Sequence, residues 1–398
     1  MLNADKRMRA EAFIYLDNNA TTPLDPAVVE EMLPFLTECY GNPSSGYAFA
    51  AKARKAMNVA RERVAALLGC EPSEIIFTSG GTESNNAVIH SAVEFEPRGK
   101  HIVTTAVEHS AVLRPCQALA KRGCDVTFLS VDADGNLDLA RLEAALRPDT
   151  ALVSVMWANN ETGVLFPVEK IAELCNRKGV PFHTDAVQAT GKIPMRLRDT
   201  AISFLSLSAH KFHGPKGAGA LYIRRGTRFS PLIEGGGQEI GRRGGTENVA
   251  SIVGLGKAAE LALHHLEAGK SDVQRMRDRF ENTVLENLSG ASVNGAGAER
   301  LPNTSSMSFA GIESSEALPL LDRHGICCSA GSACRTGSRE ASHVLRAMNP
   351  HGDGARRSLR FSLSRFNTES EIDRAAAVVP AVIKKIRETP SIFRSVVA

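Results

Sequence analysis

The chain has 398 residues, of which 43% are hydrophobic, and this is enough for a large core and more than one typical domain. Its 47 Lys and Arg residues nearly balance its 44 Asp and Glu residues, so the charge predicts no nucleic-acid partner. No signal-peptide core, no membrane-spanning apolar run and no C-x-x-C pair among the eight cysteines is present, which predicts a cytoplasmic protein with reduced thiols.

From about residue 70 to residue 225, short β-rich runs alternate with amphipathic helical patterns. The predicted strands are 74–78, 101–104, 125–129, 151–155, 180–184, 202–207 and 219–223. Helices are predicted between them over 113–122, 139–146 and 168–178, each ending near Gly or Pro. This alternation predicts an α/β domain with a largely parallel sheet, in which ligands bind beyond the carboxyl ends of the strands.

After Gly235 the pattern changes to that of a smaller α+β domain. The predicted helices there are 248–265, 271–288, 313–324 and 369–387, and the predicted strands are 304–309 and 359–363. We therefore expect a large domain over residues 20–260, and a small domain built from residues 1–19 and 261–398.

Lys211 follows the predicted strand 202–207, in the sequence Ser208-Ala209-His210-Lys211-Phe212. Taken alone it is a solvated surface lysine, as most lysines are. A lysine flanked by Ser, His and Gly at a strand end also suits an amine held for covalent work, such as a Schiff base with a carbonyl cofactor. The choice between these readings depends on the residues near it.

Gly80-Gly81-Thr82 follows the first predicted strand and precedes a helix predicted to open at Asn85. Small residues at such a turn expose backbone N–H groups, and the helix dipole favours an anion there, which predicts a phosphate site. The alternative is an ordinary turn with an N-cap, unless further phosphate ligands are present. Ser208 and His210 are candidates for that role.

Three more polar residues follow predicted strands: His109, Asn160 and Asp185. A carboxylate at Asp185 could pair with a protonated ring nitrogen and keep a pyridine cofactor electron-poor. The imidazole of His109 could stack on such a ring and move protons, and Asn160 could orient a phenolic oxygen or a carboxylate. Each residue alone is more often a capping or loop polar group, and their shared place at strand ends is what favours a site.

Together these segments resemble the cysteine desulfurases of the NifS/IscS type, which are class-V aminotransferase relatives with the pyridoxal phosphate fold type I. The segments that match are 15–22, 41–45, 78–86, 107–109, 159–163, 183–188, 208–217, 244–246 and 331–344. The resemblance covers nearly the whole chain. It implies pyridoxal 5'-phosphate as cofactor, a mostly parallel, mixed seven-stranded sheet in the large domain, and a small α+β domain with the catalytic cysteine loop.

The resemblance also implies a role for individual residues. Lys211 would form the Schiff base, Asp185 would pair with the pyridine nitrogen, and His109 would stack on the ring and transfer protons. The other implied cofactor contacts are Gly81, Thr82, Asn160, Gln188, Ser208, His210 and, across a homodimer, Thr246 of the partner subunit. The implied substrate contacts are Asn42, Asn160 and Arg360, whose guanidinium suits a carboxylate.

Cys334 lies in Ser332-Ala333-Cys334-Arg335-Thr336, a run too small and polar to bury a structural thiol. An exposed loop thiol is a candidate nucleophile, and the charge of Arg335 could favour its thiolate. The implied reaction converts L-cysteine to L-alanine, leaves a persulfide on Cys334 and passes the sulfur to an iron-sulfur scaffold protein of the NifU/IscU type. Cys334 could also share a cluster transiently with that scaffold as a metal ligand.

Several alternatives stay open on the sequence. Arg335 and Ala341 depart from the residues usual in relatives, so the sulfur acceptor is open. The short C-terminal segment after Arg387 favours the NifS branch, and hence nitrogenase cluster assembly, over a housekeeping iron-sulfur or tRNA-thiolation role. A selenocysteine lyase or an aminotransferase is the alternative enzyme.

The non-enzyme alternative is an iron-sulfur binding or assembly protein with Cys327, Cys328 and Cys334 as ligands, although their spacing is poor for a cluster. Cys327 and Cys328 are interpreted as core residues of a strand, with sulfur-accepting thiols as the other reading.

Overall fold

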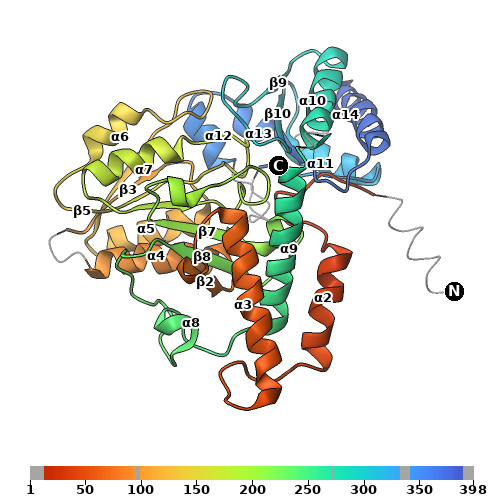
Figure 1. Ribbon diagram of the computed structural model, residues 1–398. Helices are drawn as coiled ribbons and strands as arrows, with labels where there is room; N and C mark the ends of the chain where they lie inside the picture. Colours follow the sequence, from red (N-terminus) through yellow and green to blue (C-terminus); the bar gives the residue numbers. More distant parts are fainter. Residues whose placement is uncertain (1–12, 96–98, 270–271, 332–340, 389–398) are drawn as a thin grey trace.

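The computed structural model describes residues 13–95, 99–269, 272–331 and 341–388 (Figure 1). Its centre is a seven-stranded sheet with helices packed on both faces. Apolar residues of α4 (Gly81–Phe95) and α5 (Ser110–Lys121) form the core on one face, and residues of α3 (Ala48–Leu68), α7 (Val168–Arg177) and α9 (Val249–Glu267) form it on the other. The predicted α/β architecture is confirmed.

The strand order in this sheet is β2-β8-β7-β6-β5-β3-β4. The strands are β2 (Ile75–Thr78), β3 (His101–Thr105), β4 (Asp125–Leu129), β5 (Thr150–Ser154), β6 (Phe182–Asp185), β7 (Phe204–Ser208) and β8 (Gly219–Ile223). In this sheet β8 runs opposite to the other six strands and pairs antiparallel with β2 and β7, so the prediction of a mixed but mostly parallel sheet is confirmed. Every residue of β5, β6 and β7 is buried, as expected for central strands covered on both faces.

Two helices lie in a region that the sequence patterns left unassigned: α2 (Pro26–Thr37) and α3. Figure 1 shows them beside α9, and extensive contacts join α9 to both. The approach of α9 to α3 is close, because a Cβ at Gly256 would lie 2.4 Å from the Cα of Ala60. Gly69 ends α3 with φ +63°, a conformation that favours glycine.

The sequence predicts that the helix after β2 opens at Asn85, but in the structure it begins at Gly81. The amide of Ser84 already donates to the carbonyl of Gly80. Gly and Thr have low helix propensity and predict a turn, but the structure has the first turn of a helix here. It packs closely against the segment after β6, since a Cβ at Gly81 would lie 2.4 Å from Cγ2 of Val187.

A second core lies around a three-stranded sheet of order β12-β10-β9. Its elements are β9 (Ala291–Val293), β10 (Thr304–Phe309), β12 (Ser358–Ser362), α10 (Asp272–Asn287), α11 (Ser314–Arg323) and α14 (Glu369–Glu388). The short parallel pair of β1 (Ile14–Tyr15) and β11 (Ile326–Cys327) brings the N-terminal segment to this core, where Ile14 and Leu16 are buried. The domain boundaries stay a prediction, which this second core supports.

The remaining short helices are α6 (Leu139–Ala145), α8 (Gln238–Gly241), α12 (His343–Met348) and α13 (Gly354–Arg357), with 3-10 turns at Pro72–Glu74, Leu197–Asp199 and Ala209–Lys211. None of the helices in the described part of the chain combines the length and the apolar character needed to cross a bilayer.

Candidate functional site

A cavity of about 410 Å³ lies where the parallel strands of the central sheet end. Segments that follow β2, β3, β5, β6 and β7 contribute to its wall, and the N-terminal segment and β12 close it. The predicted site residues that line this cavity are Gly81, Thr82, His109, Asn160, Asp185, Gln188, Ser208, His210, Lys211 and Arg360. The strand-end argument predicted this for Lys211, His109, Asn160 and Asp185, whereas Gln188 and Arg360 were implied only by the resemblance.

Lys211 ends the 3-10 turn after β7 and points its amine at the N-terminal segment. Its Nζ donates to the backbone carbonyl of Asn19 at 2.6 Å and to that of Ala20 at 2.8 Å. Both acceptors are backbone oxygens, so substitution of the side chains of Asn19 and Ala20 would not remove them.

Asp185 is the last residue of β6 and is 5% exposed. One carboxylate oxygen accepts a 2.6 Å hydrogen bond from the side-chain amide of Asn85, on α4, and the other accepts one from the backbone amide of Val187 at 3.0 Å. The carboxylate is therefore held in one orientation from both sides. The amide oxygen of Asn85 is buried and has no hydrogen-bond partner among the described residues.

The N-terminus of α4 has the backbone donors that suit an anion. The backbone N–H groups of Gly81, Thr82 and Glu83 precede the first turn's hydrogen bonds and carry the positive end of the helix dipole. Ser208 and His210 lie at the same cavity. Burial, followed by the charges of Lys211 and other lysines, lowers the pKa of His210 to about 4.

His109 is the N-cap of α5, and its Nδ1 accepts a hydrogen bond from the backbone amide of Ala111 at 3.2 Å. A neutral ring in this arrangement carries its proton on Nε2. Burial lowers the pKa of His109, while the charge of Asp185 opposes this and the charge of Lys211 adds to it. The ring is thus set as a neutral imidazole beside a carboxylate and an amine.

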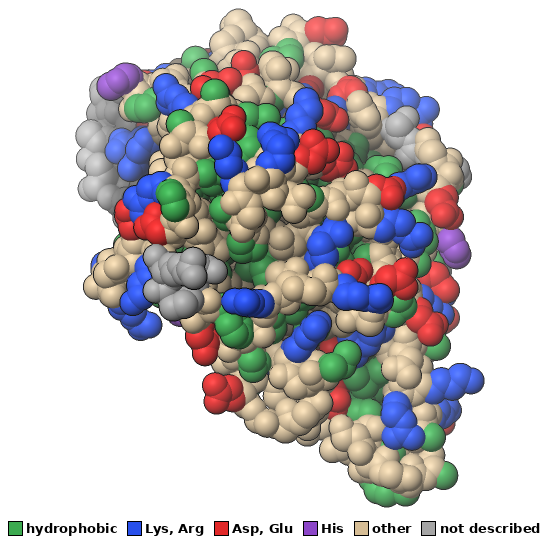
Figure 2. Space-filling view, turned by 60° about the vertical axis from the view of Figure 1, so that its left-hand side comes forward, with side chains coloured by type: hydrophobic (Ala, Val, Ile, Leu, Met, Phe, Trp, Pro, Cys, Tyr) green, Lys and Arg blue, Asp and Glu red, His purple; other side chains and the backbone are tan. Residues whose placement is uncertain are grey.

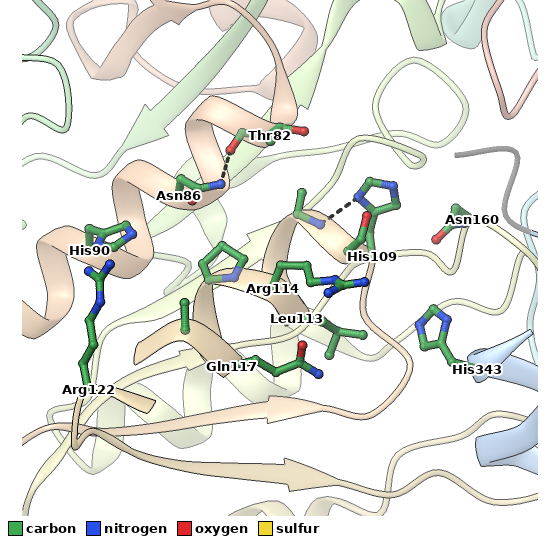
Figure 3. Close-up of a pocket in the computed structure, with 14 residues that line it drawn as sticks. Thr82, Asn86, His90, His109, Leu113, Arg114, Gln117, Arg122, Asn160 and His343 are labelled. Atoms are coloured by element: carbon green, nitrogen blue, oxygen red, sulfur yellow. Dashed lines mark hydrogen bonds between the residues drawn. The ribbon is translucent and has the colours of Figure 1, made fainter. Parts of the chain in front are cut away.

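Beyond His109 lies a second pocket of about 700 Å³, here called the outer pocket, which shares Thr82, His109, Ala111 and Asn160 with the cavity. In Figure 3, His109, Asn160 and His343 lie at one end of it. Nε2 of His343 donates to the backbone carbonyl of Glu108 at 3.0 Å. The outer pocket therefore adjoins the cavity on the side of His109.

Arg360, on β12, is 2% exposed and crosses from the second core to the cavity. Its guanidinium donates to the backbone carbonyl of Asn160 at 2.8 Å and to the carboxylate of Asp17 at 2.7 Å. Its Nε has no partner among the described residues. A buried cation with a donor still available is suited to an anionic ligand group.

Sequence reasoning missed residues that hold the site from behind. They are Asp17, Asn19, Asn85 and Lys192, each of which hydrogen-bonds a predicted site residue, and Glu108, the fully buried residue before His109. The signal for Asp17 and Asn19 was present in the segment 15–22, and Asn85 lies one helical turn after Gly81. No local pattern pointed to Glu108 or Lys192.

Two predicted site residues lie outside the cavity of this chain. Asn42 is exposed, and its side chain accepts a hydrogen bond from the amide of Ser44. Thr246 is exposed on the connection between α8 and α9. Their roles stay predictions, and the one for Thr246 concerns a partner subunit.

Cys334 lies outside the described residues. Cys327 belongs to β11, and Cys328 packs against the second core. Burial raises the pKa of both thiols, which disfavours the thiolate needed to accept sulfur or bind a metal. Within the described ranges, no group of three or more His, Cys, Asp or Glu residues could hold a metal ion.

Comparison with known proteins places this site in a family. The family profile of aminotransferase class-V matches residues 14–375. The chain is 53% identical over 374 residues to a protein of Trichormus azollae named cysteine desulfurase, and 52% identical over 377 residues to one of Azotobacter vinelandii named cysteine desulfurase NifS. Each alignment covers 94% of both proteins.

A solved structure titled NifS-like protein superposes with a TM-score of 0.87 at 41% identity, covering 94% of this chain and all of that one. This likeness confirms the predicted fold of pyridoxal phosphate enzymes of fold type I. The chain therefore belongs to the class-V aminotransferase family of pyridoxal phosphate enzymes, in which its relatives include cysteine desulfurases of the NifS type.

Proposed function

We propose that this protein is a pyridoxal phosphate-dependent cysteine desulfurase, which converts L-cysteine to L-alanine and takes up the sulfur on Cys334. The observation that carries the proposal is that one cavity holds the amine of Lys211, the carboxylate of Asp185, the imidazole of His109 and the guanidinium of Arg360. An amine for a carbonyl, a carboxylate for a pyridine nitrogen and a cation for a carboxylate are what this cofactor and an amino acid require.

The residues of the cavity fit the cofactor. The glycine turn at Gly81 admits no side chain, and the free N–H groups of α4 suit a phosphate, with Ser208 and His210 beside them. Asp185 is fixed by two hydrogen bonds and can hold a protonated ring nitrogen, while Gln188 and Asn160 can contact a phenolic oxygen. When bound, pyridoxal phosphate supplies an electron sink that stabilises negative charge on the substrate.

The chain's own residues then have distinct tasks. Arg360 binds the carboxylate of L-cysteine, with Asn160 and Asn42 as further substrate contacts. Lys211 and His109 move protons, because an amine and a neutral imidazole both line the cavity. The sulfur of Cys334 attacks the sulfur of the substrate, so that an S–S bond forms and the C–S bond breaks. The electron pair of the broken C–S bond stays with the carbon, and this carbon takes a proton to become the methyl group of alanine.

Substitution of Cys334 tests this assignment. We expect Cys334→Ala to keep the cofactor colour and to lose alanine and sulfide formation, whereas Cys327→Ala, as the matched control, keeps both. Mass spectrometry after one turnover should find one extra sulfur on Cys334. If Cys334→Ala forms alanine at the wild-type rate, the assigned nucleophile is wrong. Selenocysteine, offered in place of cysteine, decides whether the enzyme is instead a selenocysteine lyase.

The protein acts as a homodimer in this proposal. Large apolar side chains on and after α2 are exposed, including Leu33, Leu36 and Tyr40. This end of the molecule projects beyond the rest in Figure 1, and Figure 2 shows hydrophobic side chains at its tip. Such a surface suits burial against a second copy. Thr246 lies outside the cavity of its own chain, which agrees with a contact across the dimer.

Subunit mixing tests the role of Thr246. Two inactive variants, Lys211→Ala and Thr246→Ala, should regain activity when unfolded and refolded together, because one site of the mixed dimer is intact. If Thr246 serves the cavity of its own chain, mixing restores no activity, because each chain then carries one of the two changes in its own site. A chain carrying both substitutions, mixed with wild-type chains, is the reciprocal control. The mixed dimer then has no intact site if Thr246 acts across the dimer, and keeps one intact site if Thr246 acts in its own chain.

The sulfur is proposed to pass to an iron-sulfur scaffold protein for nitrogenase cluster assembly. Support comes from the relative named NifS in Azotobacter vinelandii. A strain lacking this protein should lose nitrogen fixation and keep its general iron-sulfur enzymes. Normal nitrogen fixation with loss of those enzymes would assign the protein to the housekeeping role.

A further inference from the structure

Lys192 lies behind the wall of the cavity and not in it. The residue belongs to the segment after β6, and its Nζ donates to Oε1 of Gln188 at 2.8 Å and to Oδ1 of Asn19 at 3.0 Å. Gln188 lines the cavity, whereas Lys192 lines a separate pocket of about 350 Å³ on the other side of Lys211. Lys192 can therefore act on the cavity only through its neighbours.

The local fold explains why this amine reaches Gln188. The chain turns helically after β6, with backbone hydrogen bonds from Thr190 to Ala186 and from Lys192 to Ala189. Residues four apart in such a turn share a face, which brings Lys192 beside Gln188. Gly191 has φ +75°, and a Cβ there would lie 2.9 Å from Cβ of Phe212, so the turn is held against the residue that follows Lys211.

Two contacts set the orientation of the Gln188 amide: Lys192 on its oxygen, and the backbone carbonyl of Asn19 on its nitrogen. A glutamine side chain can often be turned over without a change in shape, because its oxygen and nitrogen are alike in size. An ammonium group only donates, so the oxygen of Gln188 must face Lys192 and its nitrogen must face away. That nitrogen donates to the backbone carbonyl of Asn19 at 2.9 Å, the same oxygen that accepts from Lys211.

The second acceptor of Lys192 is also fixed. The side-chain nitrogen of Asn19 donates to Oγ1 of Thr304 at 2.9 Å, and its side-chain oxygen accepts from Asn303 at 3.1 Å. Burial, followed by the charges of Lys211 and Arg360, lowers the pKa of Lys192 well below its usual value. The two bonds use two of the three hydrogens of the ammonium form, which has no lone pair with which to accept from Gln188.

We propose that Lys192 is a positioning residue that holds the amide nitrogen of Gln188 towards the cavity, where it donates a hydrogen bond to an anionic oxygen of the ligand. In the proposed function this oxygen is the phenolic oxygen of the cofactor, so this use of the site rests on that function. The orientation of the Gln188 amide does not depend on the proposed function.

A double-mutant cycle tests the proposal. We expect Lys192→Met to shift the absorption band of the bound cofactor and to lower kcat/KM by about tenfold, as loss of one hydrogen bond to a charged group does. In a Gln188→Ala background the same substitution should change neither quantity further, because the residue through which Lys192 acts is gone. Lys192→Arg keeps a donor that cannot accept and should retain most of the activity.

Equal losses from Lys192→Met in both backgrounds would overturn the proposal, as would an unchanged band and rate in the single variant. Should the Met variant fold poorly, Lys192→Gln replaces it, since a glutamine can accept as well as donate and no longer sets the amide of Gln188. A crystal structure of cofactor-free Lys192→Met gives a readout independent of turnover. Loss of the contact from Gln188 to the Asn19 carbonyl is expected, and its persistence contradicts the inference even if the protein has another activity.

Discussion

Glu108 offers a test of the electrostatics beneath the site. This residue precedes His109, is fully buried, and accepts hydrogen bonds at one carboxylate oxygen from the hydroxyl of Thr105 at 2.8 Å and the amide of Met156 at 3.0 Å. The other oxygen has no partner among the described residues. Burial raises the pKa of Glu108 from its usual 4.5 to about 8, and the charge of Asp185 adds to the rise, so the group is neutral at pH 7.

The direction of the pH effect follows from this raised pKa. The unfolded chain releases the proton near pH 4.5 and the folded protein only near pH 8. The contribution to stability is therefore complete below pH 4.5 and is lost as the pH rises towards 8. At about 1.4 kcal/mol for each pH unit, the folded state loses roughly 2.5 kcal/mol between pH 5 and pH 7. For a chain of this length that corresponds to about 3 °C in Tm.

Glu108→Gln removes the titration and keeps the size and one acceptor oxygen. Between pH 5 and pH 7, we expect the Tm of the wild type to fall by about 3 °C more than the Tm of Glu108→Gln, with both proteins measured in the same buffers. Glu38→Gln, at an exposed position, is the control and should follow wild type. Parallel curves for wild type and Glu108→Gln would refute the reasoning, because Glu108 would then be ionised in the folded protein at both pH values.

Two further predictions concern a cation and a ring. Arg360→Lys should raise the KM for L-cysteine by roughly tenfold, because an ammonium lacks the planar fork with which a guanidinium can bond Asp17, Asn160 and a carboxylate at once. Arg365→Lys, whose ion pair with Asp25 lies outside the cavity, should leave the KM unchanged. A KM within twofold of wild type for Arg360→Lys would remove Arg360 from substrate binding. Phe280→Ala should lower the free energy of unfolding by about 3–5 kcal/mol in a denaturant titration. The ring of Phe280 is fully buried, and its centroid lies 4.8 Å from that of the Phe361 ring. A loss below about 1 kcal/mol would mean that the second core relaxes around the cavity.

Local sequence patterns predicted the strands of the central sheet but did not predict the helix α3. Alternating β-rich and amphipathic runs predicted the seven strands, because a parallel sheet covered on both faces requires continuous apolar strands. The segment of α3 has many alanines and few large apolar residues, so no strong helical stripe marks it. Its place is set by packing against α9, where Gly256 meets Ala60.

The sequence by itself determined which chemical groups line the cavity. Lys211, Asp185 and His109 follow strands, and strand ends of a parallel sheet converge on one edge, so their types and order were enough to bring them together. Only the tertiary structure decided what holds each group in place. Asp17 and Arg360 are 343 residues apart, and Asn85 and Asp185 are 100 apart. Periodicity describes only neighbours along one helix or strand, whereas these partners are chosen by how whole elements pack, which no local pattern encodes.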